Sequence, residues 1–116
     1  TKPTLKKIFN AMDDETIVNI AKNVGGIVPH ELIYLSRETF NFSNLMKMIE
    51  VSDSRFGKVK CKQNDFVFNI NILHGISENF SKFLGETHNA LCNKLSIKFN
   101  IEHIDKNMIC MKFEKP

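Results

Sequence analysis

The sequence predicts an α+β fold in which N-terminal helices precede a β-β-α-β-β unit, with a four-stranded antiparallel sheet packed against one long helix. One observation is the hydrophobic period, which is helical in the first part of the chain and alternating from Lys58 onward. The other is an alternating run over residues 66–73 that leads into a helical stripe over residues 77–95. We expect one domain over residues 1–116, with a helical part (1–51) and a β-β-α-β-β part (57–116).

The predicted strand and the long helix each carry one hydrophobic face. On the strand, the residues that share this face are Phe66, Phe68, Ile70 and Ile72. On the helix, the stripe recurs at steps of three and four and comprises Ile76, Phe80, Phe83, Leu84, Thr87, Leu91 and Leu95. We expect these two faces to be buried against each other.

Four short helices are predicted before the sheet, the first of them close to the N-terminus. The second begins at Asp13, which caps it, and ends at Gly25 and Gly26, because glycine adopts the left-handed conformation of a C-terminal cap without strain. Pro29 suits the first position of a third helix. After a polar break, Asn41 is expected to cap the fourth.

Two hairpins complete the predicted sheet. In the first, residues 58–62 pair with residues 66–73 around a turn at Asn64 and Asp65. In the second, alternating residues 97–102 pair with residues 109–113. The long helix should cover one face of this sheet, with the N-terminal helices extending the same layer.

Composition limits the classes of function. A chain of 116 residues can bury a sufficient core without disulfides or a metal, and its three widely spaced cysteines are typical of reduced thiols. The sequence shows no signal peptide and no membrane-spanning run, so we expect a cytoplasmic protein with no membrane partner. The chain opens at Thr1 rather than at Met, which leaves room for residues upstream. The net charge of +3 permits a nucleic-acid partner without indicating one.

A second face of the long helix carries mostly small side chains and is the candidate interface: Ser81, Gly85, His88 and Cys92. A glycine inside a helix lowers helix stability by about 1 kcal/mol relative to alanine, so the presence of Gly85 requires an explanation. One interpretation is close approach of a second copy, which would make a homodimer. The alternative is a tight contact with an N-terminal helix of the same chain.

No cofactor, metal site or catalytic residue is predicted. His88 and Cys92 have the spacing of two metal ligands on a helix, but two ligands do not make a site. No serine or cysteine lies near a histidine and an acid in a recognisable catalytic pattern. We therefore expect a protein that is not an enzyme.

Two further groups are candidate binding residues. His74, Gly75 and Ser77 lie at the corner between strand and helix, where backbone amides can hold an anion. The alternative is that Gly75 makes the turn and Ser77 caps the helix. The densest basic cluster is a candidate nucleic-acid site formed by Arg55, Lys58, Lys60 and Lys62. Its alternative is a solvated sheet edge that lysines protect from aggregation.

The segment Asn71-Ile72-Leu73-His74-Gly75, followed by Ser77, Phe80, Ser81 and Phe83, resembles a domain found downstream of ribbon-helix-helix or related DNA-binding segments in archaeal regulator-like proteins. The segment from Phe40 to Ile49 fits the same pattern, although Phe80 stands where another aromatic such as Trp is expected. The resemblance implies a dimerising or signal-receiving module. It also implies that DNA is read mainly by a segment before Thr1.

The leading hypothesis is therefore a non-catalytic dimerisation or signal-sensing module of an intracellular DNA-binding regulator. The first alternative is direct nucleic-acid binding by the hairpin from Arg55 to Lys62. The second is a small-molecule pocket between the helices and the sheet, for a ligand that the sequence does not identify. Its pliable lining would be Met46, Met48, Met108 and Met111.

Overall fold

The computed structural model describes residues 1–36 and 42–116, with side chains described for residues 1–26 and 42–116. The described helices are α1 (Lys2–Asn10), α2 (Asp14–Ser36), α3 (Phe42–Asp53) and α4 (Glu78–Leu95). The strands are β1 (Lys58–Gln63), β2 (Val67–Leu73), β3 (Lys98–Ile104) and β4 (Met108–Glu114). All strand pairs are antiparallel, in the order β1-β2-β4-β3. The predicted α+β fold, with a four-stranded antiparallel sheet packed against a helix, is confirmed.

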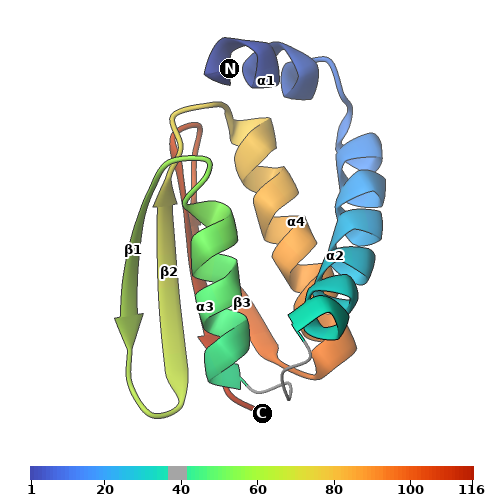
Figure 1. Ribbon diagram of the computed structural model, residues 1–116. Helices are drawn as coiled ribbons and strands as arrows, with labels where there is room; N and C mark the ends of the chain where they lie inside the picture. Colours follow the sequence, from blue (N-terminus) through green and yellow to red (C-terminus); the bar gives the residue numbers. More distant parts are fainter. Residues whose placement is uncertain (37–41) are drawn as a thin grey trace.

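The helices cover one face of the sheet in two layers (Figure 1). Helix α4 packs on β3 and β4, and α3 lies beside it over β1 and β2. Helix α2 packs along α4 on the side away from the sheet, and α1 contacts the beginning of α4. Helix α4 is therefore enclosed between the sheet and α2, whereas α3 is attached mainly through the sheet.

The core lies between the sheet and the helices α3 and α4. It is built by the inward side chains of the two central strands: Phe68, Ile70, Ile72, Ile109, Met111 and Phe113. Strand alternation predicted this face, and both central strands follow it. The inward face of β2 packs against Phe80 and Leu84 of α4, which belong to the same core cluster.

Phe66 does not belong to this face, and the prediction that it is buried is wrong. Its side chain is 69% exposed, because it lies in the turn before β2. The side-chain oxygen of Asn64 accepts hydrogen bonds from the backbone N–H groups of both Phe66 and Val67, at 3.0 and 2.8 Å. These hydrogen bonds keep Phe66 in the turn, so β2 begins one residue later than the alternation predicts.

Helix α2 continues through Gly25 and Gly26, so the prediction that they end a helix is wrong. The third short helix predicted at Pro29 is likewise part of α2. Gly25 serves helix packing instead: a Cβ at this position would overlap the carbonyl oxygen of Thr87 and lie 3.1 Å from Cβ of Ala90. The glycine therefore permits close approach of α2 to α4. The predicted polar break and the cap at Asn41 lie outside the described residues.

Within the described residues, none of the helices is both long and apolar enough to cross a membrane.

Candidate functional site

The small-residue face of α4 is buried inside the chain and packs against the sheet. Ser81 and Cys92 are fully buried, and Gly85 and His88 are also buried. A Cβ on Gly85 would lie 2.7 Å from Cδ1 of Ile101 and 3.1 Å from Cδ1 of Ile109. The prediction that Ser81, Gly85, His88 and Cys92 present an interface to a second copy is therefore wrong. The alternative of a contact within the chain is right: Gly85 packs against β3 and β4, whereas His88 contacts Asp53 of the N-terminal helix α3.

The corner between β2 and α4 is held by hydrogen bonds within the chain. His74 is fully buried, and its Nδ1 accepts from the backbone N–H of Ile76 at 2.9 Å. Its Nε2 then carries the proton and donates to Oγ of Ser81 at 2.5 Å, while Ser81 donates to the carbonyl of Asp105 at 2.8 Å. Burial lowers the pKa of His74, and the charge of Lys2 lowers it further, although Asp105 opposes the shift. The network requires a neutral imidazole, because Nδ1 of His74 accepts a hydrogen bond and so carries no proton.

The other two residues of the predicted anion site are also engaged within the chain. Gly75 adopts a φ of +64°, and its N–H donates to the carbonyl of Asn107 at 2.9 Å. The hydroxyl of Ser77 accepts from the N–H of Phe80 at 3.1 Å and caps α4. The predicted alternative is thus correct: Gly75 makes the turn and Ser77 caps the helix. These bonds, together with those of His74, argue against an anion site made by the three residues.

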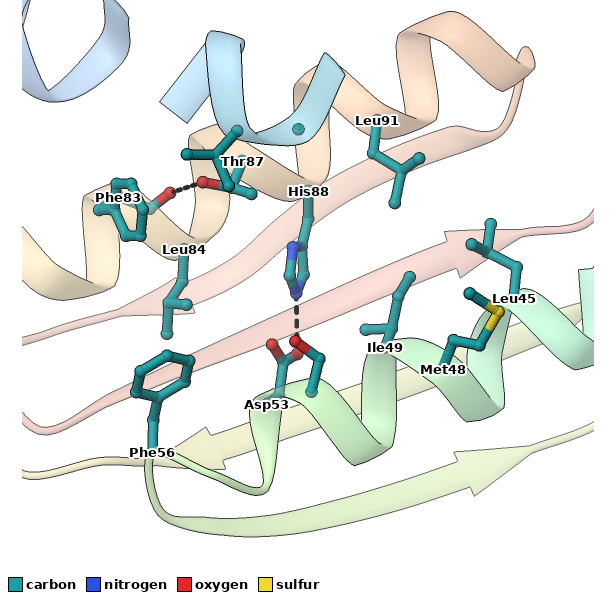
Figure 2. A pocket seen from close by; sticks show the side chains of 13 residues that line it. Leu45, Met48, Ile49, Asp53, Phe56, Phe83, Leu84, Thr87, His88 and Leu91 are labelled. Atoms are coloured by element: carbon teal, nitrogen blue, oxygen red, sulfur yellow. Dashed lines mark hydrogen bonds and ion pairs between the residues drawn. The ribbon is translucent and has the colours of Figure 1, made fainter. Parts of the chain in front are cut away.

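A cavity of about 240 Å³ lies between α2, α3 and α4. Its walls are almost entirely apolar, with Met48 and Ile49 contributed by α3 and Phe83, Leu84 and Leu91 by α4 (Figure 2). Gly25 of α2 also borders it, so the close contact between α2 and α4 forms one end of the space. The cavity is partly open to the surface, which gives a ligand a path of entry.

A buried pair formed by Asp53 and His88 lies in the wall of this cavity, which Ser52 and Thr87 also line. Oδ2 of Asp53 and Nε2 of His88 are 2.8 Å apart, and the two residues are 1% and 7% exposed. Figure 2 shows His88 reaching from α4 to Asp53 at the end of α3, with Leu84 and Phe56 on one side and Ile49 on the other. A carboxylate at the C-terminal end of a helix meets the negative pole of the helix dipole, so it requires a donor nearby. His88 is that donor, and the pair joins α3 to α4.

Sequence reasoning singled out His88 but missed Asp53, which lies beyond the predicted helical part (1–51). Two signals were present. Asp53 follows Met46 and Ile49 at helical spacing, on the inner face of the same helix. It is also an acid at a helix C-terminus, where acids are unfavourable unless they are paired.

Of the four methionines predicted to line a pocket, one borders the cavity. Met48 borders the cavity, whereas Met46 and Met111 are fully buried in the core. Met108 lies on the opposite face of the sheet, in register with Leu73. The pocket thus lies among the helices rather than between the helices and the sheet.

The cysteines are unsuited to nucleophilic chemistry. Burial raises the pKa of Cys61 to about 11 and that of Cys92 to about 12, and it also raises the pKa of Cys110. All three are free thiols that stay protonated at neutral pH. Within residues 1–26 and 42–116, no three His, Cys, Asp or Glu side chains are grouped closely enough to hold a metal ion.

The basic residues of the first hairpin are exposed. Lys58, Lys60 and Lys62 alternate along the edge strand β1 and share one face of it, and Arg55 is exposed in the preceding loop. This face of the sheet is opposite to the one that α3 and α4 cover, because Val59 and Cys61 are the residues of β1 that pack on the core.

Comparison with protein-family models finds no match to this chain, and comparison with curated proteins finds none either. The resemblance to archaeal regulator-like proteins therefore stays a prediction.

Proposed function

We propose that this chain is a non-catalytic sensing module that binds a small, mainly apolar molecule between α2, α3 and α4. The observation that carries the proposal is the apolar cavity of about 240 Å³ with the buried pair of Asp53 and His88 in its wall. Apolar pockets with a few convergent polar groups are the usual form of small-molecule sites. The pair supplies the polar group that orients such a ligand.

The size of the cavity limits the ligand. An engineered apolar cavity of about 150 Å³ is enough to bind benzene. A space of about 240 Å³ therefore fits a molecule of one or two rings, or an alkyl chain of similar volume. Asp53 is a hydrogen-bond acceptor, so a ligand that carries one hydroxyl or amine donor matches the site best.

The position of α3 explains how binding could produce a signal. This helix contacts β1 and β2, and its last residue is tied to α4 by the hydrogen bond between Asp53 and His88. A ligand that competes for Asp53 weakens this hydrogen bond and so loosens the attachment of α3 to α4. As part of the same proposal, the module belongs to an intracellular DNA-binding regulator; the support is the resemblance carried by residues 40–49 and 71–83.

Thermal unfolding with two ligands of matched shape tests the proposal. p-Cresol carries a hydroxyl donor and p-xylene does not, so p-cresol should raise the Tm more. A ligand at 100 times its Kd stabilises the folded state by about 2.7 kcal/mol, which is several degrees for a domain of this size. Both shifts should disappear in Met48→Trp, whose indole fills the cavity, and persist in the control Met48→Leu.

Two results would contradict the proposal. One is that neither compound raises the Tm of the unaltered chain at millimolar concentration. The other is that the shift is the same in Met48→Trp as in Met48→Leu, because the compounds would then bind elsewhere.

A further inference from the structure

The second face of the sheet is not covered by any described helix, and its side chains form ordered rows. The strand register places Lys60, Asn71, Cys110 and His103 side by side across the four strands. The next row along consists of Lys62, Asn69, Lys112 and Asn100. We call the polar positions of this face on β1 and β2 the basic half-sheet; they are Lys58, Lys60, Lys62, Asn69 and Asn71. Val67 and the exposed Leu73 share the same face.

Charge is distributed unevenly over this face. On the side of β3 and β4, Glu114 lies 3.7 Å from Lys98 and 3.4 Å from Lys112, which offsets their charge. Glu102 lies on the same side; burial raises the pKa of Cys110, and the charge of Glu102 raises it further. The strand positions of the basic half-sheet include three exposed lysines and no acid. A polyanion would therefore be attracted to the β1 side.

The spacing of the lysines suits a nucleic-acid strand. Alternate residues of a strand are about 7 Å apart, which is comparable to the separation of successive phosphates in an extended single strand. Asn69 and Asn71 lie in register with Lys62 and Lys60, and each amide offers both a donor and an acceptor to a base edge.

The exposed ring of Phe66 lies in the turn at the end of the same hairpin. Two hydrogen bonds to Asn64 hold the backbone of this turn, and the ring of Phe66 is exposed from it. An exposed aromatic next to a basic strand is the combination by which proteins hold single strands: lysines contact phosphates and a ring stacks on a base. An acidic protein segment would bind the lysines in the same way, but it has no base to stack on the ring of Phe66.

We propose that the basic half-sheet and Phe66 bind single-stranded nucleic acid. The three lysines contact successive phosphates, the two asparagines face the bases, and Phe66 stacks on a base at the end of the path. This surface is on the opposite side of the sheet from the cavity, so the inference does not depend on the proposed ligand site.

Fluorescence anisotropy with four labelled probes tests the inference. The probes are the 12-nucleotide strands (dT)12 and (rU)12, a 12-base-pair DNA duplex, and a 12-residue polyglutamate. We expect the two strands to bind at least tenfold more tightly than the duplex or the polyglutamate at low salt. Comparison of (dT)12 with (rU)12 shows whether the natural ligand is DNA or RNA.

Variants separate charge from stacking. Lys58→Glu, Lys60→Glu and Lys62→Glu together should weaken binding at least tenfold and reduce the salt slope by about 2, since each lost phosphate contact contributes about 0.7 for a single strand. Phe66→Ser should weaken binding between about five- and a hundredfold and leave the salt slope unchanged. The matched controls are Lys7→Glu, Lys22→Glu and Lys47→Glu together for charge and Val51→Ser for an exposed apolar side chain, since all four residues are exposed on helices.

Three results would overturn the inference. The first is equal loss of affinity in the control lysine variant, which would indicate only the effect of net charge. The second is polyglutamate binding as tight as that of the strands, which would indicate an acidic protein partner. The third is tighter binding of the duplex, or a Phe66→Ser variant that binds like Val51→Ser.

Discussion

The two sides of helix α4 differ in how completely they are filled. On the sheet side, Gly85 and Cys92 leave no spare space, and a single added carbon at Gly85 would meet Ile101 and Ile109. On the helix side, Leu84, His88 and Leu91 border a cavity of about 240 Å³. A close-packed side contributes stability, whereas an unfilled side with a buried polar pair costs stability and needs another explanation. We take ligand binding to be that explanation.

The largest effect is expected from adding volume on the filled side. Gly85→Leu should lower the free energy of unfolding by about 3 kcal/mol, because a leucine forces Ile101 and Ile109 out of their positions. Urea unfolding measures this loss. Gly85→Ala is the control: the flexible end of Ile101 can shift by a few tenths of an ångström, and alanine favours the helix by about 1 kcal/mol. A stable Gly85→Leu variant would show that this side is not closely packed.

A smaller loss is expected when the polar pair on the cavity side is broken. Asp53→Ala should lower the free energy of unfolding by about 2 kcal/mol, because His88 loses its charged hydrogen-bond partner. Asp53→Asn, which keeps an acceptor oxygen, should lose less. The exposed turn residue Asp65 provides the control, since Asp65→Ala should change stability by no more than about 0.5 kcal/mol. Equal values for Asp53→Ala and Asp65→Ala would mean that the pair does not hold α3 to α4.

The smallest effect concerns pH and the filled side. Burial lowers the pKa of His74 in the folded chain below its ordinary value of 6.5. As the pH falls, His74 is therefore protonated at a higher pH in the unfolded chain than in the folded chain. The stability associated with a neutral His74 is fully present above about pH 6.5 and decreases as the pH falls from there toward the folded pKa.

Two measurements check the direction of this pH dependence. The ring of His74, followed by NMR, should titrate below 6.5 in the folded chain. Between pH 7.5 and 5, the unaltered chain should also lose more stability than His74→Gln does. A His74 that titrates above 6.5 would contradict the assigned network with Ile76 and Ser81.

Local pattern predicted much of the fold, because the alternation of β2 and β4 and the stripe of α4 are decided by burial along one element. Prediction from local pattern failed where contact with an element distant in the sequence determines the structure. Gly25 has the local appearance of a helix end, yet it lies inside α2 because Thr87 of α4 approaches there. Phe66 continues the alternation of β2 in sequence, but its backbone N–H donates a hydrogen bond to the side chain of Asn64, which keeps it in the turn.

The candidate site was predicted less well than the fold. A row of small residues on α4 indicates close contact, but the sequence does not say whether a sheet, a helix or a second copy makes it. The pair of Asp53 and His88 spans 35 positions in the chain, and pairing over such a distance cannot be read from periodicity. The local signs of it were the helical spacing of Asp53 with Met46 and Ile49, and the presence of an acid at the end of α3.

An NMR titration of the chain with p-cresol tests the central claim most directly. We predict saturable shifts of the backbone amides around Met48, Asp53, Leu84 and His88, with smaller changes on the uncovered face of the sheet, and no such shifts in Met48→Trp. Saturation without any change around Asp53 and His88, or equal shifts in Met48→Trp, would contradict the assignment of the cavity as a ligand site.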